Sequence, residues 1–113
     1  MVAELDRTLA ALADPTRRAI VERLRARPQR PSEVAEALSM SRPAMSRHLR
    51  VLRRAGLVVQ EALEDDARAR LVSLRTEPLT RLRAWVEDVE AMWADQLEAF
   101  KVHAERVHRR RRR

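Results

Sequence analysis

Apolar residues recur every three or four positions along most of the chain, a spacing that predicts amphipathic helices. We expect a first helix from Val2 to Ala13. A second helix should begin at Asp14-Pro15, because aspartate caps free helix amides and proline fits the first helical position. This second helix should end before Pro28 or Pro31. The apolar positions of the two helices are Leu5, Leu9, Leu12, Ile20 and Leu24.

The segment Ser32–Val58 has the pattern of two short helices joined by a tight turn. Ser32-Glu33 is expected to open the third helix. Ser41 should cap the fourth, where Pro43 is tolerated because first-turn amides have no intrahelical acceptor. Gly56, the only glycine in the chain, offers the left-handed conformation that ends a helix at low cost. The buried side of the third helix should consist of Val34, Ala35 and Leu38.

The fourth helix, expected over residues 41–55, combines a basic face with an apolar one. It carries five arginines and no acid, and Met45, Leu49 and Leu52 recur among them at a spacing of three to four. One face can therefore enter a core while another presents cations to a polyanion. Nucleic acid is the first partner that this pattern indicates. The five arginines are Arg42, Arg47, Arg50, Arg53 and Arg54.

After Gly56 the pattern changes from helical to extended. Leu57–Leu63 and Arg70–Leu74 predict two short strands, which the intervening residues 64–69 can close as a hairpin. From Pro78 a helical pattern returns for roughly 30 residues, or about 45 Å. Its apolar stripe is long for so small a domain, which favours a second subunit over a helix that folds back on its own core. The stripe consists of Leu79, Leu82, Trp85, Val86, Val89, Trp93, Leu97 and Phe100.

Length and composition indicate one folded domain. The chain has 113 residues, of which 45% are hydrophobic, enough for a modest core. We expect a single domain over residues 1–108 and a disordered basic tail over 109–113, because adjacent like charges repel. The absence of cysteine excludes disulfides and thiolate chemistry. No apolar run has membrane-spanning length, and we expect a cytoplasmic protein without a membrane partner.

The net charge of +7 is unevenly distributed. Asp14–Arg54 holds eleven arginines against four acids, whereas Thr76–Glu105 holds three bases against seven acids. The last eight residues add six arginines. Such segregation suits a protein that binds phosphates with one face and a different partner with another. The excess of 23 arginines over one lysine is also compatible with a general compositional bias.

The motif LADPTRRAIVERL, followed by paired helices ending in MSRPAMSRHLRVLRRAGLV, resembles the ArsR/SmtB family of bacterial winged-helix transcription regulators. The likeness covers about Glu4–Arg83. The later segment RLRAWVEDVEAMWADQLEAF is similar to a branch without the metal-sensing residues. The resemblance implies a mainly α winged helix-turn-helix fold of four helices, a two-stranded wing and a long C-terminal dimerisation helix. It also implies a homodimer whose paired recognition helices enter successive major grooves of a palindromic operator in double-stranded DNA, usually repressing transcription.

Within that resemblance, the N-terminal half of the recognition helix should reach base edges. Arg42 and Arg47 are expected to read bases, because arginine can fork onto the O6 and N7 atoms of guanine. Ser41 and Ser46 carry hydroxyls short enough to contact phosphates or bases at the helix N-terminus. His48 is either a phosphate contact or a structural residue. The residues expected on the DNA backbone are Arg50 and Arg54.

The hairpin would be the wing. Arg68 and Arg70 are placed to reach a minor groove or phosphates. Asp65 and Asp66 occupy the expected tip, however, where carboxylates would be repelled by phosphates. Wing contact is therefore weakly supported. For any single arginine of the recognition helix or wing, a solvated surface role is the alternative.

The first and last helices should form the dimer interface that the resemblance implies. Trp85, Met92, Trp93 and Phe100 could also frame an apolar pocket for an unknown small-molecule effector, although such spacing is more typical of plain core. The arginine tail is either a disordered arm that adds salt-sensitive DNA affinity or a solvated terminus. The predicted interface residues are Leu5, Leu9, Leu82, Trp85, Val86, Val89, Trp93, Leu97 and Phe100.

Metal binding and catalysis are both disfavoured. In the family that this chain resembles, thiolate ligands occur near the positions of Arg30 and Ser32. Neither of these residues can ligate a soft metal. Asp95, His103, Glu105 and His108 lack the spacing of a site on the last helix. No nucleophile motif or glycine-rich phosphate loop is present, so we expect no enzyme, no cofactor and no metal. Two alternatives to a specific repressor stay open: an architectural DNA-binding protein, and a winged-helix module whose long helix binds another protein.

Overall fold

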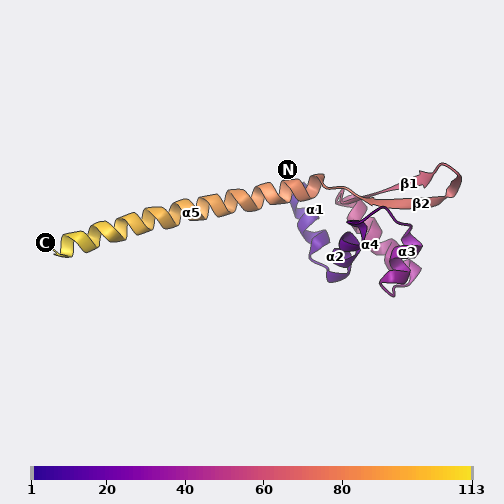
Figure 1. Ribbon diagram of the computed structural model, residues 1–113, viewed down its shortest axis with the longest axis horizontal. Helices are drawn as coiled ribbons and strands as arrows, with labels where there is room; N and C mark the ends of the chain where they lie inside the picture. Colours follow the sequence, from indigo (N-terminus) through magenta and orange to yellow (C-terminus); the bar gives the residue numbers. More distant parts are fainter. Residues whose placement is uncertain (1, 113) are drawn as a thin grey trace. The chain divides into compact units, whose positions relative to one another are not determined.

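The structure, a computed structural model, describes residues 2–112, with the side chains of Val2, Ala67 and Arg68 outside the description. It confirms the expected mainly α winged-helix order (Figure 1). The elements are α1 (Val2–Leu12), α2 (Pro15–Leu24), α3 (Pro31–Ala37), α4 (Arg42–Arg54), β1 (Val58–Leu63), β2 (Asp66–Leu74) and α5 (Glu77–Arg112).

The chain divides into two compact units, one ending at Leu82 and the other beginning at Arg83. The single domain expected over residues 1–108 stays a prediction. The division into units lies here because the core residues of the described chain end at Val72, and the side chains of α5 beyond Arg83 are almost all exposed. Those side chains add no core within one copy of the chain.

The core of the first unit is built from the inward faces of α1–α4 and the base of the hairpin. Ala11 on α1, Ile20 on α2, Leu52 on α4 and Val72 on β2 have no exposed surface, and Val34 on α3 is only 1% exposed. Burying a valine, leucine or isoleucine side chain stabilises the fold by about 1.5–3 kcal/mol. The core residues are Ala11, Ile20, Val21, Leu24, Val34, Ala35, Met45, Leu49, Leu52, Leu57, Val58 and Val72.

Two of the predicted helix starts are confirmed by their caps. The Asp14 carboxylate accepts a hydrogen bond from the Arg17 amide at 3.0 Å, and the Ser41 hydroxyl accepts one from the Ala44 amide at 3.3 Å. The third helix differs from the expectation, because it begins at Pro31 rather than at Ser32-Glu33. The reason is that Glu33 Oε1 accepts the Arg30 amide at 3.2 Å, which satisfies the free donor one residue before the proline.

The turn between α3 and α4 and the end of α4 both use left-handed backbone. Ser39 has a φ of 54° and Gly56 a φ of 74°. Gly56 therefore ends α4 as predicted, since a glycine adopts this conformation without a Cβ clash. The Leu57 amide then donates to Leu52 O at 2.9 Å, which turns the chain directly from the recognition helix into the hairpin.

The hairpin is antiparallel, with Val58 opposite Leu74 and Leu63 opposite Asp66. The expected second strand began at Arg70, but β2 already begins at Asp66, so the turn contains only residues 64–65. A register shift beside Ala62 absorbs the extra residues and allows the earlier start.

A short segment between α2 and α3 joins the sheet edge, which sequence periodicity did not predict. The Gln29 amide donates to Val72 O at 3.1 Å, and the Val72 amide donates to Gln29 O at 2.8 Å. The Gln29 side chain is 2% exposed and donates from Nε2 to Arg23 O at 2.7 Å. A single bridging residue flanked by two prolines has no strand pattern, so only the folded chain reveals it.

Helix α5 continues through Arg112, whereas the sequence led us to expect a disordered tail from residue 109. The arginines of its last turn lie at the negative end of the helix macrodipole, which favours cations there and offsets part of their mutual repulsion. Among residues 2–112, none of the helices combines the length and the apolar character needed to cross a membrane.

Candidate nucleic-acid interface

Helix α4 has the two faces that its sequence predicted. Met45, Leu49 and Leu52 are buried in the core. On the opposite side, Arg47, Arg50 and Arg54 are exposed. At 100° per residue these three arginines lie within about 60° of one another around the helix axis. The fold therefore presents a row of three cations on the face that points away from the protein.

The exposed arginines of α4 are available to an external anion. Within the described chain, the side chains of Arg42, Arg47, Arg50 and Arg54 form no hydrogen bond or ion pair. Arg53 differs, because its Nη1 donates to Gln60 Oε1 on β1 at 3.5 Å. Four guanidinium groups without an internal partner, on one short helix, give this surface a positive potential that attracts polyanions.

The two arginines predicted to read bases do not share a face of α4. Arg42 and Arg47 are five residues apart, so their Cα–Cβ directions differ by about 140° around the axis. Arg42 lies with Ser46 and Arg53 on the flank nearest the hairpin, since Arg53 reaches Gln60 there. The structure thus groups Arg47 with Arg50 and Arg54, and it sets Arg42 apart at the first helical position.

The serines at the start of α4 have different environments. Ser41 is exposed, but its hydroxyl already accepts the Ala44 amide, so its first role is to cap the helix. Ser46 is exposed on the flank that carries Arg42, one turn further into the helix. Both positions border the helix N-terminus, where the macrodipole favours an anion.

Arg17 connects three helices, a role that the sequence analysis missed. Its Nε donates to Ala11 O at 2.8 Å and its Nη2 to Ala10 O at 3.1 Å, so the guanidinium caps the C-terminal carbonyls of α1. The side chain is only 18% exposed, and its Nη1 lies 3.8 Å from the Asp14 carboxylate. A charged donor at the negative end of a helix is favourable.

His48 on α4 contacts the guanidinium group of Arg17. Its Nδ1 lies 3.5 Å from Arg17 Nη1, and its ring is half-buried. Of the two roles that the sequence left open, the geometry favours the structural one. Arg18 caps α1 in the same way, because its Nη1 donates to Leu12 O at 2.8 Å. Two of the eleven arginines in the basic segment Asp14–Arg54 thus donate to backbone carbonyls of the protein itself.

Beside the hairpin a surface hollow of about 340 Å³ is lined by basic residues from two parts of the chain. Arg70 on β2 and Arg30 beside α3 both line it, and both are exposed. Arg70 therefore lies where the wing meets the helix-turn-helix segment. The side chain of the other predicted wing residue, Arg68, lies outside the described residues. The hollow is lined by Arg30, Pro31, Ser32, Gln60, Ala69 and Arg70.

Three carboxyl groups near helix starts have lowered pKa values. The pKa of Asp14 is lowered mainly by the hydrogen bond from the Arg17 amide, and the Arg17 charge adds to the effect. The pKa of Glu33 is lowered mainly by the Arg30 amide and further by the Arg27 side chain. For Glu77 its own amide is the largest cause, followed by a hydrogen bond from Arg75.

Folding stability should therefore fall in acid. A carboxyl whose pKa is lowered in the fold stabilises it above the ordinary value, about 3.9 for aspartate, and this contribution is lost as the pH falls through the lowered value. In Asp14→Asn the cap persists without a titrating group. We expect wild type to lose more unfolding free energy than Asp14→Asn between about pH 5 and pH 2. Urea unfolding followed by circular dichroism would measure both curves, and parallel curves would contradict the assignment.

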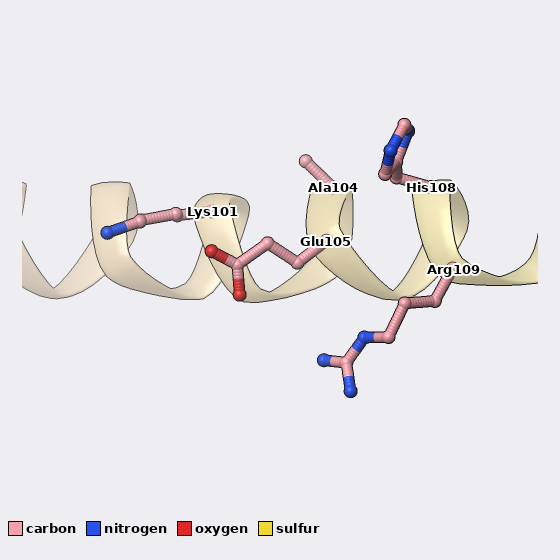
Figure 2. Close-up of a pocket in the computed structure, with 5 residues that line it drawn as sticks. All are labelled: Lys101, Ala104, Glu105, His108 and Arg109. Atoms are coloured by element: carbon pink, nitrogen blue, oxygen red, sulfur yellow. The ribbon is translucent and has the colours of Figure 1, made fainter.

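The described part of the long helix shows no cluster of metal-ligating side chains within one copy. Among the described residues, no three His, Asp or Glu side chains gather closely enough to hold a metal ion. A hollow of about 420 Å³ lies along α5, and Figure 2 shows that all five lining side chains project from this one helix. They are Lys101, Ala104, Glu105, His108 and Arg109. The effector pocket proposed around Trp85, Met92, Trp93 and Phe100 remains a prediction.

The chain is similar to known regulators and to one domain family. The helix-turn-helix domain family matches residues 12–61. The HTH-type transcriptional regulator Rv2034 of Mycobacterium tuberculosis is 41% identical over 95 residues, which cover 84% of this chain and 83% of that protein. The ArsR-like transcriptional regulator from Rhodococcus sp. RHA1 is 32% identical with a TM-score of 0.79, over 88% of this chain and 92% of that one.

The homodimeric winged helix-turn-helix domain Mb0332 from Mycobacterium bovis shares the fold at 23% identity, with a TM-score of 0.63 over 84% of this chain and 85% of that one. The TM-scores show that both solved structures share the overall fold of this chain. With 41% identity to a regulator over most of both chains, this protein belongs to the ArsR/SmtB family of winged helix-turn-helix transcriptional regulators.

Proposed function

We propose that the protein is a cytoplasmic, homodimeric repressor that binds a palindromic operator in double-stranded DNA. The observation that best supports this proposal is the exposed row of Arg47, Arg50 and Arg54 on α4. The opposite face of the helix is buried in the core. An α-helix fits the major groove of B-DNA, and arginine is the side chain that most often forks onto guanine there. A recognition helix held rigidly by its buried face can keep these cations in register with base edges and phosphates.

The roles of the individual residues follow their positions on α4. Arg47 and Ser46 lie in its N-terminal half, which is the part that reaches base edges in this docking mode. Arg42 begins the helix on the flank nearest the hairpin and is proposed to contact a base or a phosphate beside it. Arg50 and Arg54 lie further along the row and are proposed to bind phosphates. The remaining proposed DNA contacts are Ser41 at the cap and Arg68 and Arg70 on the wing. His48 is proposed to act indirectly, through its contact with Arg17.

The proposed dimer uses apolar side chains that one copy leaves uncovered. In the first unit Leu9 is 40% exposed, and Leu5 and Leu82 are half-buried. In the second unit Trp93 is 63% and Phe100 71% exposed. So much exposed aromatic surface on a single helix is typical of a protein interface. Trp85, Val86, Val89 and Leu97 complete the proposed interface.

Binding to the protein's own promoter fragment and to random DNA, compared across salt concentrations, tests the proposal. Non-specific binding rests on phosphate contacts and should weaken by orders of magnitude between about 50 and 200 mM salt. A specific repressor should keep a preference for the promoter of about 10³-fold or more. Equal loss of affinity on both fragments would instead indicate an architectural protein. Undetectable binding to either would favour the protein-interaction module.

A further inference from the structure

The hollow beside the hairpin forms where distant parts of the chain meet. Gln29, the residue before Arg30, is paired with Val72 on β2 through two backbone hydrogen bonds, at 3.1 and 2.8 Å. In an antiparallel bridge the two chains run in opposite directions, so the start of α3 continues beside Arg70. Gln60 is added from β1, where it is paired with Val72. The bridge therefore brings Arg30 and Arg70 to the lining of one hollow.

Arg70 lies on the face of the hairpin that packs against the helices. Side chains alternate between the two faces of a strand, so Arg70 shares its face with Val72, two residues later. Val72 has no exposed surface, whereas Arg70 is exposed. The guanidinium group of Arg70 is therefore held just outside the core, next to the start of α3.

Both arginines of the hollow are available to an external anion. Among the residues that the structure describes, the side chains of Arg30 and Arg70 form no hydrogen bond or ion pair. The carboxylate of Glu33 is already engaged, because Oε2 lies 3.4 Å from Arg27 Nη2 and Oε1 accepts the Arg30 amide at 3.2 Å. No acid is found among the described residues that line the hollow. Two unneutralised cations in one hollow give it a positive potential.

The hollow also borders the recognition helix. Gln60, one of its lining residues, accepts a hydrogen bond from Arg53 Nη1 on α4 at 3.5 Å. A helix in the major groove has a DNA backbone along each side, because the groove is only about 12 Å wide. The hollow is therefore next to the flank of α4 along which a row of phosphates would run.

We propose that the hollow binds one phosphate group of the DNA backbone, held jointly by the guanidinium groups of Arg30 and Arg70. A guanidinium donates two parallel hydrogen bonds to phosphate oxygens, so arginine suits such a site. Arg30 thereby becomes a DNA contact that lies on neither the recognition helix nor the wing. This inference rests on the proposed function and deepens it. A free phosphate ion offers the same chemistry, and the experiment separates the two sources.

Glutamine replacements at Arg30, at Arg70 and at both positions test the shared phosphate. Each single replacement should weaken binding to the promoter fragment and to random DNA by the same factor, about tenfold, because a phosphate contact carries no sequence information. The double replacement should reduce the salt slope by only about one for each subunit, since both arginines hold the same phosphate. Unchanged binding, or a slope reduced by about two for each subunit, would overturn the proposal.

Arg75→Gln is the matched control. It removes the same charge just after β2, where Arg75 is paired with Glu77 at 3.5 Å and does not line the hollow. Its affinity for DNA and its salt slope should equal those of wild type. Urea unfolding of every variant checks the fold, which we expect to be unaffected because the start of α3 uses the backbone amide of Arg30.

Methylphosphonate linkages test the contact from the DNA side, because they remove the charge of a single phosphate without any change in the protein. One linkage in each half-site of the promoter fragment should weaken binding of wild type about tenfold. The same linkage should leave binding of the double variant unchanged, since the arginines that hold this phosphate are already absent. Equal losses for wild type and the double variant at every linkage would overturn the proposal.

Inorganic phosphate, titrated at constant ionic strength without DNA, is the probe for the other source. We expect no submillimolar binding, because a DNA phosphate is presented at high effective concentration by a duplex already bound to α4. Submillimolar binding that the double variant loses, with DNA affinity unchanged, would assign the hollow to a free ion and overturn its assignment to the DNA backbone. Isothermal titration calorimetry would measure this binding.

Failure of this inference and failure of the proposed function give different results. A preference for the promoter that persists, with affinities unchanged by the replacements at Arg30 and Arg70, would refute only the phosphate site. Equal binding to promoter and random DNA, with both affinities lowered by these replacements, would refute only the specific repressor and would support the phosphate site.

Discussion

Arg47→Ala is expected to weaken binding to the promoter by about 1–3 kcal/mol for each recognition helix and to relax the preference for one base pair in each half-site. The reason is that Arg47 is exposed, has no partner within the described chain and lies in the N-terminal half of α4, the part that reaches base edges. A gel-shift titration on the promoter fragment and on fragments with single base changes would measure both effects.

Two further variants make this result interpretable. Arg54→Ala should weaken binding equally on all sequences and reduce the salt slope by about one for each lost phosphate contact. Arg25→Ala removes the same charge just after α2, where Arg25 is paired with Glu22 at 2.9 Å, and should leave promoter binding unchanged. If Arg47→Ala behaves like Arg25→Ala, α4 is not the recognition helix.

Arg17→Ala is expected to lower the free energy of unfolding by about 2–4 kcal/mol, the largest loss for any arginine whose side chain the structure describes. The guanidinium is 18% exposed and donates to two carbonyls at the end of α1, and hydrogen bonds from charged groups are worth about 1.5–3 kcal/mol each. Its removal deprives Ala11 O of this donor, leaves Ala10 O with only the Ala13 amide at 3.3 Å, and withdraws the contact with His48 on α4. Urea unfolding of both proteins measures the loss.

Arg18→Ala is the matched control, because Arg18 also donates to the end of α1 but is exposed to solvent. Water can replace an exposed donor, so we expect a loss of about 1 kcal/mol or less. Arg17→Lys should fall between the two, since an ammonium keeps the charge but cannot span both carbonyls. Equal losses for Arg17→Ala and Arg18→Ala would show that the three-helix contact adds nothing.

The sequence was sufficient to predict helix limits and buried helix faces, because these depend on interactions between neighbouring residues. Asp14, Ser41 and Gly56 set the limits of α2 and α4, because capping and left-handed backbone depend on a few neighbouring residues. The buried side of α4 followed equally directly from the spacing of Met45 and Leu49. The start of α3 was missed by one residue, because a glutamate three positions on accepts the Arg30 amide.

Nonlocal contacts were not visible in the sequence. The bridge from Gln29 to Val72 joins residues 43 positions apart, and no periodicity marks a single paired residue. Arg17 and Arg18 were included in the charge count of the basic segment Asp14–Arg54, but the structure shows their guanidinium groups on carbonyls at the end of α1. The net charge includes every arginine, but only the fold determines which guanidinium groups hydrogen-bond within the protein.

The sequence by itself determined that this protein is a winged helix-turn-helix regulator with a basic recognition helix, because caps, periodicity and charge are properties of short segments. Only the tertiary structure decided which arginines face outward together. Arg47, Arg50 and Arg54 form one row, Arg42 stands apart, and Arg17 is enclosed. The physical reason is that a side chain's availability depends on what packs against it, and that is settled by contacts between segments far apart in the chain.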